Sequence, residues 1–219
     1  MRSIMPPSRG FPSIVSLLLI LCFALRPVPA AATEKAAKDF LVSLNREAVA
    51  QFRDPNLDDV EKEQRFRDLA ERSFDIPRIS KFVLGVNWRR ATPEQQKDFI
   101  TIFKEVNTQR FLPMFSKYSD QTFTVTKVRQ DENKSDLFFV YSTITRPEGE
   151  PINVEWRVFN RGDQFTILDV VAEGVSMVLT LRKEYGSVIN NDGLDGLIAQ
   201  LRKMIEEGTT ESAIPASTQ

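Results

Sequence analysis

The chain has 219 residues, with 29 basic and 30 acidic side chains, a single cysteine and no histidine. This composition excludes triads with a histidine base. Because Cys22 lies in a segment that we expect to be removed, zinc sites and cysteine nucleophiles are excluded from the mature chain as well. Enzymes built on carboxylates, lysine or tyrosine remain open. The composition therefore favours a protein that holds something without transforming it.

Residues 1–32 have the composition of an export signal. Arg2 and Arg9 precede an almost continuously apolar run over residues 11–25, and small residues follow at 28–32. This order is typical of a secretory signal peptide. The apolar run is shorter than the ~20 residues that a spanning helix needs. We expect cleavage after Ala30 or Ala32, and an uncleaved membrane anchor remains the alternative.

Removal of residues 1–32 also removes three arginines and no acid, so the mature chain has 26 basic and 30 acidic residues and a net charge of −4. A weakly acidic protein is a poor candidate for binding nucleic acid. We expect one domain over residues 33–207, followed by a disordered polar tail over residues 208–219.

The first half of the mature chain is predicted to be helical. Apolar residues recur at helical spacing over residues 33–52 and 57–74, and Pro77 opens a short helix that Gly85 ends. Thr92-Pro93-Glu94-Gln95 is the best local start signal, because threonine and glutamine three residues apart can cap each other's backbone. The helix that follows carries one stripe of seven side chains: Phe99, Ile102, Phe103, Val106, Arg110, Met114 and Tyr118.

Alternating patterns then predict four strands, over residues 122–129, 137–146, 152–159 and 165–171. The connections are short, so we expect an antiparallel meander. Gly174 is predicted to open a helix, a turn follows at residues 190–193, and a last amphipathic helix covers 194–205. The fold class is α+β, with a helical lobe packed on a twisted four-stranded antiparallel sheet.

Catalytic groups are sparse. Ser176 follows a strand and opens a helix, but no histidine is present to activate it, so a bond to backbone near the helix start is the simpler interpretation. Asp169, Glu173 and Glu155 gather near the same junction. Paired carboxylates hydrolyse glycosides, whereas acids at a helix start are usually caps.

Two stretches resemble the MlaC family, the periplasmic phospholipid carriers and toluene-tolerance proteins of Gram-negative bacteria. The first is the run from Asp169 to Met177, followed by Glu184-Tyr185 and by Asp195-Gly196-Leu197. The second is the earlier set Phe82-Val83-Leu84-Gly85, Trp88-Arg89 and residues 91–95, with Phe99 and Phe103. The resemblance covers about residues 37–205, and a hopanoid-associated branch is similar.

The resemblance implies a periplasmic carrier that encloses acyl tails in an apolar pocket between sheet and helices, without catalysis, cofactor or metal. It implies transport between an outer-membrane lipoprotein–porin complex and an inner-membrane ABC transporter with an mce-type domain, which maintains outer-membrane lipid asymmetry. We expect a monomer. The resemblance places nine tail-contacting positions here: Phe82, Val83, Phe99, Phe103, Phe139, Trp156, Ile167, Val175 and Val178.

Three alternatives stay open. The cargo can be a hopanoid or another lipid carried by the same family. The chain can be a small α+β enzyme that uses Asp169, Glu155 or Tyr141. It can also be an envelope adaptor whose core is solid, because one sequence does not distinguish a packed aromatic core from a hollow one.

Overall fold

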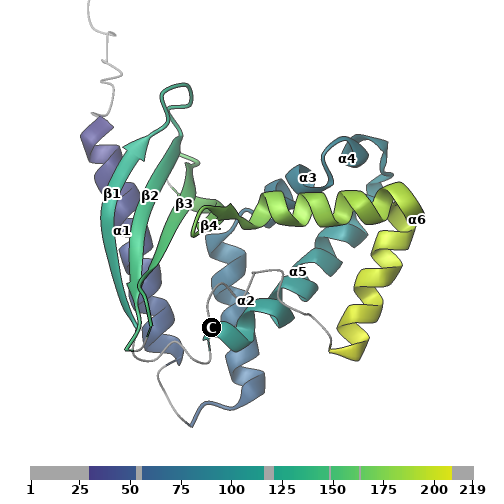
Figure 1. Ribbon diagram of the computed structural model, residues 1–219, viewed down its shortest axis with the longest axis horizontal. Helices are drawn as coiled ribbons and strands as arrows, with labels where there is room; N and C mark the ends of the chain where they lie inside the picture. Colours follow the sequence, from purple (N-terminus) through teal and green to yellow (C-terminus); the bar gives the residue numbers. More distant parts are fainter. Residues whose placement is uncertain (1–29, 53–55, 116–120, 148, 163, 209–219) are drawn as a thin grey trace, which may run out of the picture.

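The computed structural model describes residues 30–52, 56–115, 121–147, 149–162 and 164–208. In chain order (Figure 1), five helices precede a sheet and a last helix follows it: α1 (Ala30–Phe52), α2 (Asp59–Ser73), α3 (Ile76–Leu84), α4 (Val86–Arg90), α5 (Pro93–Phe115), β1 (Thr122–Gln130), β2 (Leu137–Thr145), β3 (Ile152–Asn160), β4 (Phe165–Ala172), β5 (Val175–Ser176) and α6 (Met177–Glu207). The predicted α+β class is confirmed. None of the helices in these ranges is long and apolar enough to cross a membrane.

The helix starts are explained by local capping. The predicted capping box is present, because Thr92 N donates to Gln95 Oε1 at 3.0 Å and Gln95 N donates to Thr92 Oγ1 at 3.2 Å. Asp75 caps α3 by accepting from Arg78 N at 3.3 Å, and Pro77 lies in the first turn, as predicted. These bonds satisfy backbone donors that a helix start otherwise leaves unpaired.

The sheet is an antiparallel meander in the order β1-β2-β3-β4-β5. The prediction of four strands was one short, because a two-residue β5 pairs Val175 with Ala172 and Ser176 with Val171. Glu173 and Gly174 connect the two strands with φ of 47° and 78°, the positive values that a tight hairpin turn requires. The last helix therefore begins at Met177, with Ser176 as its N-cap, and not at Gly174.

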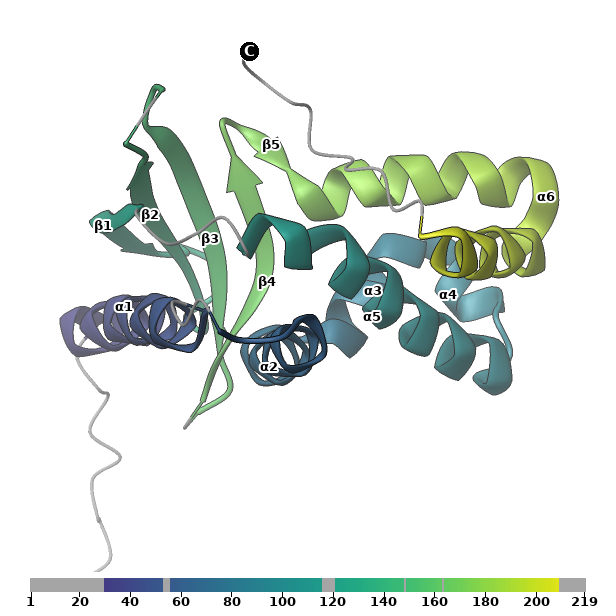
Figure 2. The same ribbon diagram turned by 90° about the horizontal axis from the view of Figure 1, so that it is seen from below.

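Helix α1 lies across one face of the sheet and α2 lies beside α1 next to β4, while α3, α5 and α6 form a lobe beyond β4 (Figure 2). Val154 and Val158 of β3 are buried and Trp156 half-buried, as the predicted alternation requires. Helices α2, α3 and α6 contact β4, which is therefore the strand that joins sheet to lobe.

Helix α6 contains the predicted turn as a bend. Gly193 has φ 74° and ψ 177°, values outside the helical region, and α6 turns there so that its second half runs back along the lobe (Figure 1). The predicted export signal lies outside the described residues apart from 30–32, and the predicted tail apart from Gly208.

Candidate functional site

The buried apolar side chains form two clusters. The helical cluster lies among α3, α5 and α6 and includes Val83, Phe99, Phe103, Val178 and Tyr185. The sheet cluster lies between α1 and the sheet and includes Ala37, Leu41, Phe138, Val140, Val158 and Ile167. Phe74, between α2 and α3, packs against both clusters. Two separate cores are therefore candidates for an apolar binding site in this protein.

Six of the nine predicted tail-contacting residues belong to these clusters. Val83, Phe99, Phe103 and Val178 are buried together in the helical cluster. The rings of Phe99 and Phe103 lie 5.6 Å apart, and Tyr185 meets both edge-on at 6.1 and 6.4 Å. Trp156 and Ile167 are part of the sheet cluster instead. The structure thus brings four of the nine into one core and two into the other.

The remaining three residues are in neither cluster. Phe139 pairs with Arg157, while its neighbour Val140 pairs with Trp156, so Phe139 points to the opposite face of the sheet. The Arg129 guanidinium lies 4.3 Å from the centroid of its ring. Phe82 is 45 % exposed and Val175 is 42 % exposed.

Sequence reasoning placed Arg110 on an apolar stripe and named Tyr185 within the family resemblance, and it assigned neither residue a role in the site. Tyr185 is 4 % exposed and Arg110 is 7 % exposed. The signal was in the sequence, because Arg110 is the one charged member of its stripe. Burial raises the pKa of Tyr185 to about 12, and the charge of Glu184 adds to this, whereas the charge of Arg110 opposes it.

The raised pKa of Tyr185 predicts a loss of stability at high pH. The pKa of Tyr185 in the folded protein exceeds the ordinary value of 10. The stability that depends on the neutral hydroxyl is therefore fully present below pH 10 and is lost as pH rises toward 12. We expect the free energy of unfolding to fall by up to about 2 kcal/mol over this range. Urea midpoints at pH 8, 10 and 11 measure the fall, and Tyr185→Phe should reduce it. An equal fall in both proteins would contradict the assignment.

The acids at the β4–α6 junction are engaged in structural bonds. Asp169 is 4 % exposed and accepts from Ser176 Oγ at 2.6 Å and from Val178 N at 3.1 Å. It also pairs with Arg157 at 3.2 Å. Ser176 Oγ in turn accepts from Leu179 N at 3.1 Å. This arrangement fixes the start of α6 and favours the capping interpretation over catalysis by this group.

We therefore expect Asp169→Ala to destabilise the fold by about 2 kcal/mol, because it leaves Ser176 Oγ and Val178 N without their buried acceptor and removes one of the two carboxylates that pair with Arg157. Asp169→Asn keeps one acceptor oxygen and should lose less. Thermal unfolding of the two variants beside the parent measures the effect. A parent-like melting temperature for Asp169→Ala would show that the carboxylate does not hold the junction.

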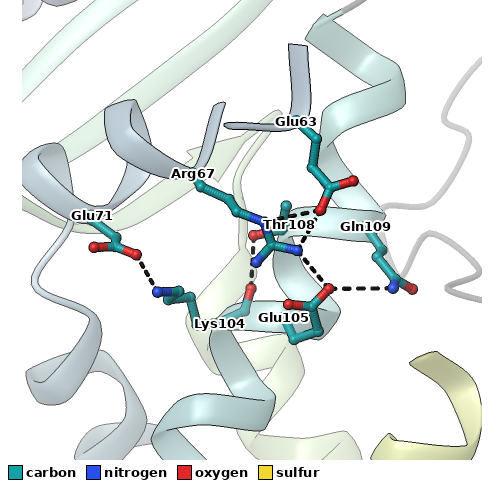
Figure 3. A network of polar contacts seen from close by, with 7 residues as sticks. All are labelled: Glu63, Arg67, Glu71, Lys104, Glu105, Thr108 and Gln109. Carbon is teal, nitrogen blue, oxygen red and sulfur yellow. Dashed lines mark hydrogen bonds and ion pairs between the residues drawn. The ribbon is translucent and has the colours of Figure 1, made fainter. Parts of the chain in front are cut away.

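A polar network joins α2 to α5 on the flank of the helical cluster (Figure 3). Arg67 of α2 pairs with Glu63 at 2.5 Å and with Glu105 of α5 at 2.7 Å. The bond from Arg67 lowers the pKa of Glu105, and the bond to Glu105 raises the pKa of Arg67. Lys104 pairs with Glu71 across the same two helices. The network holds α2 beside the face of α5 that flanks the cluster.

The described residues contain no group of three or more acids, histidines or cysteines placed to hold a metal ion. What they do contain is a buried apolar core and, on elements at or next to it, a set of exposed apolar side chains that we call the apolar edge. Phe82, Val86, Val175 and Leu179 form most of the exposed large hydrophobic residues, and all four are on α3, α4, β5 or the start of α6. Such an arrangement can receive an apolar ligand.

The chain is similar to curated proteins of known name. The chain is 24 % identical over 123 residues to the intermembrane phospholipid transport system binding protein MlaC of Haemophilus influenzae, covering 55 % of this chain and 58 % of that protein. It is 26 % identical over 122 residues to the toluene tolerance protein ttg2D of Pseudomonas putida, covering 55 % and 56 %. The match thus spans a little over half the length of these curated relatives.

A solved structure shares the fold. The phospholipid-binding protein from Ralstonia solanacearum, solved in complex with a phospholipid, superimposes with a TM-score of 0.62 at 21 % identity, over 82 % of this chain and 97 % of that one. The sequence model of the MlaC protein family matches residues 36–203 of this chain. These residues include both apolar clusters and the β4–α6 junction, and the chain belongs to the MlaC family.

Proposed function

We propose that this protein is a periplasmic phospholipid carrier that encloses acyl tails among apolar side chains and releases the lipid unchanged. The helical cluster is the observation that carries the proposal, because Val83, Phe99, Phe103 and Val178 bring three separate helices around one apolar interior. Family membership supports the same function, as do the names of the H. influenzae relative and of the R. solanacearum structure. No catalytic step is proposed.

Exposing the acyl tails of a phospholipid to water has a large free-energy cost, which is the physical reason for a carrier. Each acyl methylene exposed to water costs about 0.8 kcal/mol, so two ordinary tails, roughly 28 methylenes, cost on the order of 20 kcal/mol gross. A protein interior of phenylalanine, valine and leucine removes most of this barrier. Release requires an imprecise fit, because a tightly matched core would hold the cargo.

The exposed apolar edge is the proposed entry for the tails. Phe82 and Val86 lie on α3 and α4, and Leu179 lies on α6 beside buried Val178. Arg182 links the two sides, since its guanidinium donates to Phe82 O at 2.9 Å and lies 4.9 Å from the centroid of the Phe82 ring. Opening here would expose the helical cluster while the sheet cluster stays closed.

The proposed partners follow from the family. They are an inner-membrane ABC transporter with an mce-type domain and an outer-membrane lipoprotein–porin complex, with the carrier exported to the periplasm by residues 1–32. The exchange would maintain the lipid asymmetry of the outer membrane. The carrier would act as a monomer.

Transfer between vesicles tests the proposal. Donor vesicles carry a fluorescent phospholipid and acceptor vesicles carry none. The protein is added in a much smaller molar amount than the lipid. We expect transfer to rise in proportion to protein, and a second donor set containing a hopanoid separates the two cargo classes. A rate equal to that without protein for both donors would rule out the carrier.

A further inference from the structure

Arg110 is a buried cation with no ion-pair partner among the residues that the structure describes. Residues 99, 103, 106 and 110 of α5 follow helical spacing, so Arg110 points to the same side as Phe99, Phe103 and Val106, toward the helical cluster. The residue is 7 % exposed, and its Nε is buried with no hydrogen-bond partner. Across the described ranges, no carboxylate forms an ion pair with it.

Tyr185 presents a second donor to the same interior. Its ring packs against Phe99 and Phe103, and its hydroxyl is buried with no partner among the residues that the structure describes. Arg110 is close enough that its charge lowers the pKa of Tyr185. Among the described residues, the exposed Glu184 also acts on Tyr185, and its charge raises the pKa of the hydroxyl. The two groups therefore present two buried donors, the Nε–H of a charged guanidinium and a phenol hydroxyl, with no acceptor for either among the described residues.

Two buried donors without an acceptor destabilise the folded protein unless a ligand supplies the acceptor. An arginine does not lose its charge by deprotonation, and a buried guanidinium N–H without an acceptor destabilises the fold. A buried hydroxyl without a partner adds a smaller cost. The missing group must be rich in acceptor oxygens and negatively charged. It must also enter an interior lined by phenylalanine and valine, which a small hydrated anion has no reason to do.

We propose that Arg110 and Tyr185 form an internal site for an oxyanion attached to an apolar chain, either the phosphate of a phospholipid or the carboxylate of a fatty acid. The guanidinium would donate from Nε and its terminal nitrogens, and the tyrosine from its hydroxyl. The inference rests on the proposed carrier function and adds to it a preference for acidic amphiphiles over neutral ones. The chain that bears the oxyanion would pack against the helical cluster.

Arg110→Met is the main test, because it keeps the length of the side chain and removes the charge. Binding is measured by calorimetry for dispersed phosphatidylglycerol, oleate, diacylglycerol and inorganic phosphate. We expect Arg110→Met to weaken binding of phosphatidylglycerol, oleate or both by roughly 10- to 100-fold, and to leave diacylglycerol binding unchanged. Tyr185→Phe should weaken the same ligands by a smaller factor. Arg90→Met is the matched control, since Arg90 is exposed on α4.

Stability separates a ligand role from a structural one. Without lipid, Arg110→Met should have a urea midpoint equal to or above that of the parent, because it removes an uncompensated charge. A lower midpoint with unchanged ligand preference would assign Arg110 to the fold and overturn the site. Parent-like affinity of Arg110→Met for phosphatidylglycerol and oleate would do the same and leave the carrier standing. Tight binding of inorganic phosphate alone would contradict the need for an apolar chain. A parent protein that binds none of the lipids would instead refute the proposed function.

Discussion

Val175→Glu is expected to abolish phospholipid loading while leaving the fold intact. Val175 lies in β5 at the edge of exposed apolar side chains, next to the start of α6, and is 42 % exposed. A glutamate there keeps its charge in water in the empty protein, so the cost to folding is small. In the loaded protein the same carboxylate would lie against acyl tails, where an unpaired charge costs several kcal/mol.

Lipid uptake from vesicles by the purified variant, followed by extraction and phosphate analysis, measures the effect. Val60→Glu is the matched control, because Val60 is 77 % exposed on α2, away from the proposed entry. The expected result is loss of bound phosphate for Val175→Glu alone, with equal melting temperatures for both variants. Normal loading of Val175→Glu would mean that tails enter elsewhere.

Phe99→Ala and Phe138→Ala are expected to destabilise the lipid-free protein equally and to respond differently to lipid. Both rings are 0 % exposed, Phe99 in the helical cluster and Phe138 in the sheet cluster. Removing either should cost about 3 to 5 kcal/mol through lost burial and the cavity that remains. If the proposed pocket is correct, a bound tail can occupy the cavity left by Phe99, whereas the proposal places no tail at the cavity left by Phe138.

Thermal unfolding with and without saturating phospholipid separates the two cases, since a ligand stabilises the folded state in proportion to its affinity for that state. We expect the lipid-induced rise in melting temperature to be larger for Phe99→Ala than for the parent, and no larger than the parent's for Phe138→Ala. Equal rises in the two variants would place the tails outside the helical cluster.

The secondary structure that could be predicted from the sequence is the part that depends on interactions between residues close together in the chain. The capping box at Thr92 and Gln95 involves backbone groups three residues apart, and the alternation at Val154, Trp156 and Val158 follows from the two-residue period of a strand. Strand β5 was missed because two residues are too few to show any period. Its existence depends on the turn at Glu173 and Gly174, which brings the chain back against β4.

The candidate site was harder, because periodicity tells which face of an element is buried and not what that face meets. Phe99 and Ile167 look alike in sequence but belong to different clusters. Phe139 lies in a run that is apolar on both faces, and only the register of β2 with β3 shows that it points away from Trp156. Arg110 was visible as a charge within an apolar stripe. Its significance depended on its having no ion-pair partner among the described residues, which is a tertiary property.

Mass spectrometry of the intact protein, isolated without detergent from the periplasm of its native cells, tests the central claim most directly. The account predicts a mass increase equal to one phospholipid on most molecules, and organic extraction should release that lipid and restore the mass of the bare chain. Protein that is isolated lipid-free, and that stays lipid-free after incubation with phospholipid vesicles, would contradict the account.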